Sequence, residues 1–112
     1  MTNEKLPAPP RDLSKESAKW WSEVVAEYEM ASHHLRLLTL AARAWDRAES
    51  AREALRNNGL TYRDRHGVLR PRPEAVIERQ AMVAFARLLR ELRLDGAPEP
   101  DVRLPRIGGG RR

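Results

Sequence analysis

Alanine recurs along one face of a predicted helix in the middle of this chain of 112 residues. Ala41, Ala44, Ala48, Ala51 and Leu55 follow one another at alternating intervals of three and four residues, which is the spacing of a helical seam. Small side chains along a seam let two helix backbones approach closely. The seam therefore predicts one of two arrangements, a tight helical hairpin or a ring of packed subunits.

The sequence also marks the ends of the helix that carries this seam. Thr39 can act as its N-cap, because a hydroxyl oxygen accepts a hydrogen bond from a backbone N–H of the first turn. Asn58 and Gly59 tolerate the left-handed conformation in which helices commonly end. We therefore predict a helix over residues 39–57.

Two further helices are predicted on either side of it. Ser14 is a suitable N-cap, and the apolar residues after it follow helical spacing, so a helix is expected from Ser14 to about His33. Pro73 suits the first turn of another helix, which is expected to run to about Arg93. Together with the middle helix, these segments predict a mainly α fold with three principal helices.

A short β-hairpin is predicted between the second and third helices. Residues 60–63 and 68–70 flank the polar link 64–67, which ends in a glycine. Two strands alone are only marginally stable in water. We therefore expect this hairpin to pack against something else.

Adjacent tryptophans near the N-terminus suggest a contact beyond the core. Trp20 and Trp21 cannot both face one narrow helical stripe, so one is expected to pack inside while the other covers a neighbouring element or subunit. Together with the alanine seam, they give the residues predicted to contact another copy of the chain: Trp20, Trp21, Ala44, Trp45, Ala48, Ala51 and Leu55.

One domain, residues 13–94, is expected between two flexible ends. Three prolines within residues 1–12 forbid a helix and predict a flexible Pro-rich arm, and residues 95–112 are expected to form a mobile basic tail. The chain has no cysteine, which excludes a disulfide framework and thiolate metal sites. It shows neither a secretory signal nor a membrane span, so a soluble cytoplasmic protein is expected.

Positive charge is concentrated in the middle third of the chain. The formal net charge is +5, and residues 36–72 hold nine Lys or Arg against four Asp or Glu. Such a balance favours binding to a polyanion. Arginine outnumbers lysine eighteen to three, which a GC-rich genome explains as well as selection for guanidinium groups does.

The basic residues form three candidate groups. The hairpin group, a candidate for DNA binding, is Arg63, Arg65, Arg70 and Arg72. The helical group, also a candidate for DNA binding, is Lys15, Lys19, Arg36, Arg43 and Arg47. The tail group, which could bind nucleic acid or a partner protein, is Arg103, Arg106, Arg111 and Arg112. Such residues contact phosphates without reading base sequence. For the hairpin group, pairing of the arginines with acids of a neighbouring helix or subunit is an equally open explanation.

Motifs for catalysis or cofactor binding are missing from the sequence. His33 and His34 are adjacent and project about 100° apart on a helix, so they do not converge on one metal ion. The glycines at 108–110 lack the following Lys-Ser/Thr and the preceding strand of a phosphate-binding loop. The sequence therefore predicts a protein that is not an enzyme and that uses no metal and no cofactor.

The order of short motifs along the chain is distinctive. A Pro-rich arm leads into Leu13-Ser14-Lys15-Glu16 and a Trp-bearing helix, and Leu38-Thr39 opens a long helix that ends at Asn57-Asn58-Gly59-Leu60. A Gly-containing hairpin, Pro71-Arg72-Pro73 and a helix closing in Leu88-Leu89-Arg90-Glu91-Leu92-Arg93-Leu94 follow. In this order, about residues 7–106 resemble the small terminase subunit of tailed bacteriophages.

The resemblance implies a function for the whole assembly. It implies a homo-oligomeric ring that recognises double-stranded viral DNA and hands it to the large terminase subunit, which is the ATPase and nuclease of the packaging motor. It also implies a location in the cytoplasm of the infected bacterial host. Two alternatives stay open from the residues themselves: a small helical DNA-binding regulator or antitoxin, and a structural connector of the virion.

Overall fold

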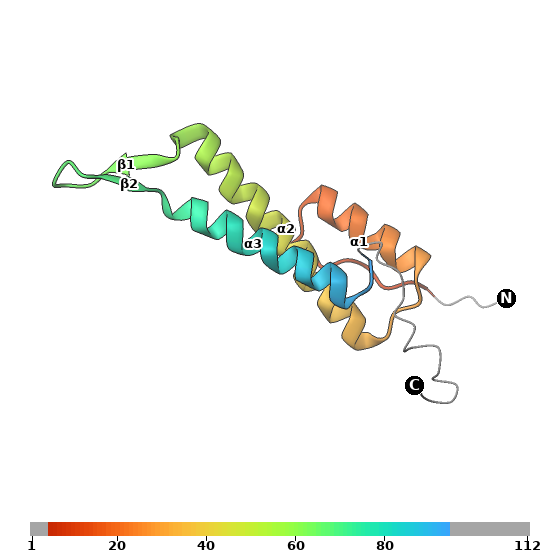
Figure 1. Cartoon of the computed structure of the whole chain (residues 1–112). Coiled ribbons are helices and arrows are strands. Elements are labelled where there is room, and N and C mark those ends of the chain that lie inside the picture. Colours follow the sequence, from red (N-terminus) through yellow and green to blue (C-terminus); the bar gives the residue numbers. More distant parts are fainter. Residues whose placement is uncertain (1–4, 95–112) are drawn as a thin grey trace, which may run out of the picture.

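The computed structural model describes residues 5–94 and contains three helices and one hairpin (Figure 1). In chain order these are α1 (Lys15–Glu27), α2 (Ser32–Asn58), β1 (Thr61–Arg63), β2 (Leu69–Pro71) and α3 (Pro73–Glu91). The mainly α fold with a short hairpin between the second and third helices is therefore confirmed. The predictions for residues 1–4 and for the tail at 95–112 lie outside the described residues. Within the described part of the chain, no helix is both long enough and apolar enough to cross a membrane.

The predicted boundary between the first two helices was wrong. Helix α1 begins after Ser14 as expected, but it ends at Glu27, and α2 begins at Ser32 instead of near Thr39. The Nδ1 atom of His34 accepts the N–H of Ala31 at 3.2 Å, which satisfies one backbone donor at the start of α2. Thr39 lies inside α2, where its hydroxyl accepts a hydrogen bond from a tryptophan of α1, so it does not cap the helix.

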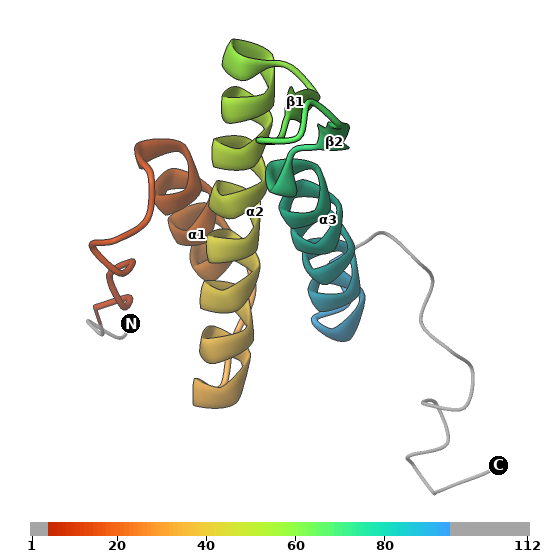
Figure 2. The same ribbon diagram turned by 90° about the vertical axis from the view of Figure 1, so that its left-hand side faces the viewer.

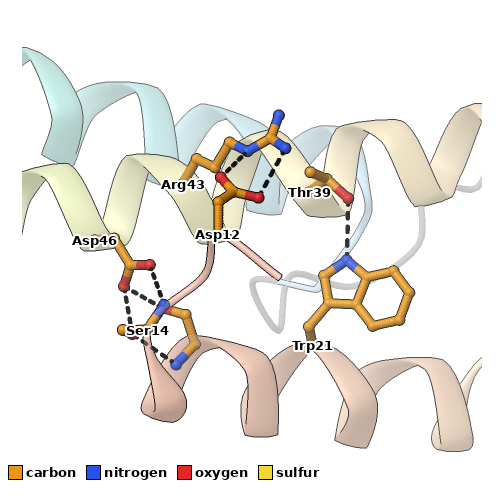
Figure 3. Close-up of polar contacts among 7 residues, drawn as sticks. Asp12, Ser14, Trp21, Thr39, Arg43 and Asp46 are labelled. Carbon is orange, nitrogen blue, oxygen red and sulfur yellow. Dashed lines mark hydrogen bonds and ion pairs between the residues drawn. The ribbon is translucent and has the colours of Figure 1, made fainter. Parts of the chain in front are cut away.

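Helix α2 is the centre of the molecule, with α1 and α3 on either side of it (Figure 2). The core between α1 and α2 gathers Leu13, Trp21, Val24, Val25 and Ala42 around a fully buried Leu38, and Trp21 is only 3% exposed. Figure 3 shows the polar contacts that accompany this core. The indole N–H of Trp21 donates to the hydroxyl of Thr39 at 3.1 Å, and Asp46 of α2 accepts hydrogen bonds at the N-terminus of α1.

The most extensive contact between elements joins α2 and α3. Ala48, Ala51 and Leu55 of the alanine seam are buried, as is Ala81 of α3. The seam thus forms a tight helical hairpin within one chain, which is one of the two arrangements expected from its small residues. Ala81 is the one buried residue that α3 contributes, so the rest of this helix keeps substantial exposure.

The hairpin extends beyond the ends of α2 and α3 (Figure 1). Its strands are antiparallel, with Tyr62 opposite Arg70, and every residue of both strands is exposed. Within the described residues its strands pair only with each other, so the support expected for the hairpin is not found in this part of the chain and stays a prediction. Gly59 at the end of α2 and Gly67 in the turn both have positive φ, as the breaks in the helix and the strand require.

Candidate nucleic-acid interface

The structure separates the two described groups of basic residues. The hairpin group lies at one end of the molecule, whereas α1, with Lys15 and Lys19, packs against the other half of α2 (Figure 1). The two groups therefore do not form one continuous patch within a single chain. The tail group, Arg103 to Arg112, lies outside the described residues.

Asp64 organises the turn of the hairpin. Its Oδ1 atom accepts the backbone N–H groups of His66 and Val68 at 2.8 and 2.9 Å, and its Oδ2 atom accepts the Nε–H of Arg70 at 2.9 Å. The hydrogen bond from Arg70, followed by that from Val68, lowers the pKa of the Asp64 carboxyl below its ordinary value. The only acid of the hairpin is thus used to shape the turn that presents the arginines.

Two more arginines contact the backbone of the hairpin and its stem. Arg63 donates to the carbonyl oxygen of Gly67 at 2.8 Å, and Arg72 donates to the carbonyl oxygen of Asn58 at 3.2 Å. The guanidinium of Arg72 also lies 5.9 Å from the centre of the Tyr62 ring. Each guanidinium has five N–H donors, so these contacts leave donors that can bind a phosphate.

Arg65 differs from the other three members of the hairpin group. It lies in the turn, is exposed, and makes no hydrogen bond or ion pair among the described residues. A substitution at this position therefore removes a charge without removing a contact that shapes the hairpin.

The helical group is divided between α1 and α2. Arg36, Arg43 and Arg47 are seven and four residues apart, so helical periodicity places them along one stripe of α2. Asp12 of the N-terminal arm pairs with Arg43, and two N···O distances of 2.8 and 3.1 Å make the pair bidentate (Figure 3). This hydrogen bond holds the pKa of Asp12 below its usual range. Within one chain, part of the positive charge of the stripe is therefore already neutralised.

Asp46 has a structural role that the sequence did not reveal. Its carboxylate accepts the backbone N–H of Ser14 at 2.8 Å and the hydroxyls of Ser14 and Ser17, both at 2.6 Å. Partial burial opposes ionisation of Asp46, but these hydrogen bonds outweigh it and lower the pKa of its carboxyl. The negative charge lies at the N-terminus of α1, where the helix dipole favours it. In the sequence, Asp46 is indistinguishable from the solvated acids around it.

The residues predicted to contact another subunit differ in exposure within one chain. Four of them, Trp21, Ala48, Ala51 and Leu55, are buried inside the chain. Trp20 and Trp45 keep part of their surface and meet the same ring of α3, with their centroids 5.8 and 5.2 Å from that of Phe85. Ala44 lines a groove between α2 and α3. Trp20, Trp45 and Ala44 are therefore the members of this set that remain accessible to a partner.

The described residues contain no cluster of metal-ligating side chains. No group of three or more His, Cys, Asp or Glu side chains among them could hold a metal ion. His33 and His34 stack with ring centroids 4.1 Å apart, and the Nδ1 atom of His34 is engaged by the backbone of Ala31.

A family model described as phage terminase, small subunit, matches residues 17–105 of the chain. The match covers all of α1 except its first two residues, and all of α2, the hairpin and α3. No curated protein and no solved structure matches the chain. Because the family model spans well over half of the residues, this chain belongs to the small-subunit family of phage terminases.

Proposed function

We propose that this protein is the DNA-recognition and regulatory component of a phage packaging motor. It binds double-stranded viral DNA, assembles as a homo-oligomeric ring, and presents the DNA to the large terminase subunit in the cytoplasm of the infected host. The observation that carries the proposal is the exposed hairpin with four arginines and one acid, in a chain of the small-terminase family.

The geometry of the hairpin supports contact with phosphates. Tyr62 lies opposite Arg70 in the register, and Arg72 lies over the Tyr62 ring, so both arginines share one face of the hairpin. Arg65 extends from the turn at the far end. Guanidinium groups spread along an exposed element can bind successive phosphates of a duplex, and each contact releases counterions.

Assembly strengthens such contacts. A single hairpin provides a few charges, whereas a ring presents one copy of the hairpin for each subunit around a common axis. Once one hairpin has bound, the others act at a high effective concentration. Many weak phosphate contacts made together by a ring therefore give stable binding to DNA, and they do not require an element that reads the base sequence.

The salt dependence of DNA binding tests this proposal. The hairpin variant replaces Arg63, Arg65, Arg70 and Arg72 with Ser, and a variant with the same reduction in charge replaces Lys15, Lys19, Arg43 and Arg47 with Ser. Binding of a fluorescein-labelled duplex is followed by anisotropy over a range of salt concentrations. We expect the hairpin variant to flatten the slope of log K against log salt by about 0.9 for each phosphate that the protein no longer binds. The helical variant is expected to change it less.

Arg65→Ser alone provides a control for folding, because Arg65 makes no hydrogen bond or ion pair within the described chain. It should flatten the slope by the amount that corresponds to about one phosphate, while the thermal unfolding curve stays unchanged. An unchanged slope in the four-arginine variant would exclude the hairpin as the DNA-binding element. Absence of any salt-dependent DNA binding by the wild type would favour a virion connector.

A further inference from the structure

The three helices leave two broad faces uncovered. Helix α2 lies between α1 and α3, and no other helix or strand of residues 5–94 covers either side of this row (Figure 2). Stable domains bury the apolar side of each layer against a second layer. The apolar residues on the two faces are therefore available to another chain.

One side, the aromatic face, is formed by two adjoining hollows. It consists of Trp20, Trp45, Met82 and Phe85, bordered by Glu16, Glu49, Glu78 and Arg52. The larger hollow has a volume of about 400 Å³, Met82 is 56% exposed, and Trp45 is 37% exposed. Arg52 pairs with Glu49 at 2.7 Å, whereas Glu16 and Glu78 form no ion pair among the described residues. This face is apolar at its centre and acidic at its edges.

The other side, the arginine face, has the opposite charge. Its two hollows are lined mainly by Arg36, Leu40, Arg43, Ala44, Arg47, Ile77 and Ala84, and neither hollow is lined by an acid. Leu40 is half exposed. Arg36 and Arg47 form no ion pair among the described residues.

Three acids lie next to the arginine face, in an adjoining hollow towards the hairpin: Asp12, Asp46 and Glu74. Asp12 pairs with Arg43, and Asp46 and Glu74 share this hollow with Arg47, so the acids lie nearest to that end of the arginine face. The hollow around Arg36 and the exposed Leu40 is lined by no acid, so the positive charge of the arginine face is greatest there.

The two faces lie on opposite sides of the line along which α2 and α3 touch. Ala48 and Ala81 mark that line, because both are buried. On α3, helical spacing puts Ile77 and Ala84 on one side of Ala81, with Met82 and Phe85 on the other. The hollows agree with this arrangement, since those of the aromatic face share no lining residue with those of the arginine face.

We propose that the aromatic face of one copy of this chain binds the arginine face of a second copy. The contact would cover Trp45 and Met82 with Leu40 and Ile77 of the partner copy, and it would bring Glu16 and Glu78 near Arg36 and Arg47. Charge complementarity selects this pairing, because joining two aromatic faces would place two sets of glutamates against each other.

A contact between two different faces is heterologous, so a pair of subunits joined in this way keeps one unused face at each end. Further subunits bind to these faces until the assembly closes into a ring. This assignment rests on the ring of the proposed function and names its interface. It has a further consequence for the helical group, since Arg36 and Arg47 would serve subunit contact and leave DNA to the hairpin. Cyclic symmetry then places every hairpin at the same level of the ring.

Two single substitutions at exposed positions test the pairing. Met82→Glu puts a carboxylate into the aromatic face, and Leu40→Glu puts one into the arginine face. Each variant alone should fail to assemble normally, with the concentration at half-assembly raised at least about tenfold, because a carboxylate would be buried against apolar surface. Mixed in equal amounts, they should form a one-to-one heterodimer through the single intact face of each. The mass is measured by light scattering on a size-exclusion column without DNA.

Leu60→Glu is the matched control, because Leu60 is exposed outside both faces, and it should assemble like the wild type. Circular dichroism and thermal unfolding check that both variants fold, and Met82→Gln and Leu40→Gln should weaken assembly less. A Leu40→Glu protein with the mass of the wild type would overturn the proposal, as would a mixture without heterodimer. A wild type that assembles in this way but binds no DNA would refute the DNA-binding function and leave the interface intact.

Discussion

The two sides of α2 are built differently. Towards α1, Leu38 is fully buried, Trp21 is nearly so, and Asp46 anchors the start of the neighbouring helix with three hydrogen bonds. Towards α3, alanines meet a helix of 19 residues that buries only Ala81. The α1 side therefore has the packing of a finished core, whereas the α3 side keeps apolar surface that no other helix or strand of residues 5–94 covers. The α1 side stabilises the single chain, whereas the α3 side carries the surface that we propose for contacts between copies.

Among the substitutions on the two sides of α2, Trp21→Ala should cause the largest loss of stability. Removing a buried indole creates a cavity and leaves the Thr39 hydroxyl without its donor, so the free energy of unfolding should fall by about 3–5 kcal/mol. Urea denaturation of the variant, followed by far-UV circular dichroism, measures the decrease. A decrease below about 1 kcal/mol would show that α1 contributes little to the stability of the fold.

The same substitution, valine to alanine, can be made on both sides of α2. Val25 on the α1 side is 6% exposed, and Val76 on α3 is 41% exposed. Val25→Ala should cost about 2 kcal/mol of unfolding free energy, and Val76→Ala should stay within about 0.5 kcal/mol when both proteins are measured as monomers. Equal decreases from the two substitutions would contradict the distinction between a finished side and an open side.

Asp46→Asn should lower the free energy of unfolding by about 1 kcal/mol at neutral pH, less than Trp21→Ala or Val25→Ala, because the site is partly exposed and Asn keeps one acceptor oxygen. The pKa of Asp46 is lowered by folding, so its ionised form stabilises the native state above the unfolded-state pKa of about 3.9. That contribution disappears as pH falls through the lower native pKa.

The difference in stability between wild type and Asp46→Asn should accordingly shrink in acid. Urea titrations at neutral pH and below pH 3 measure it, and the other carboxyls titrate in both proteins alike. A difference that stayed constant with pH would mean that the charge of Asp46 does not contribute.

Local sequence signals were sufficient for most of the secondary structure. Ser14 as N-cap, Gly59 at the end of the long helix, the glycine turn of the hairpin and Pro73 at the start of α3 all occupy the predicted places. The start of α2 was mispredicted because Thr39 has the chemistry of an N-cap. Its hydroxyl instead meets Trp21, which is 18 residues away in the sequence. A capping signal cannot show that a distant side chain competes for the same oxygen.

The features of the candidate site divide in the same way, into those set by neighbouring residues and those set by residues far apart in the sequence. The charge of the hairpin group and its place on a projecting turn follow from residues 60–73 alone, because strand alternation and turn chemistry act over a few residues. The contacts between residues far apart in the sequence did not follow. Asp12 and Asp46 lie 31 residues or more from Arg43 and Ser14, respectively, and become their partners only when α1 packs on α2.

The sequence by itself determined the three helices, the hairpin, the excess of arginine and the resemblance to the small terminase family, since these depend on local propensity and on the order of motifs. Only the tertiary structure decided that the alanine seam packs within the chain, that Trp20 and Trp45 converge on Phe85, and that α3 leaves its sides open. Periodicity states which residues share a helix face, but it carries no information about which neighbour covers that face.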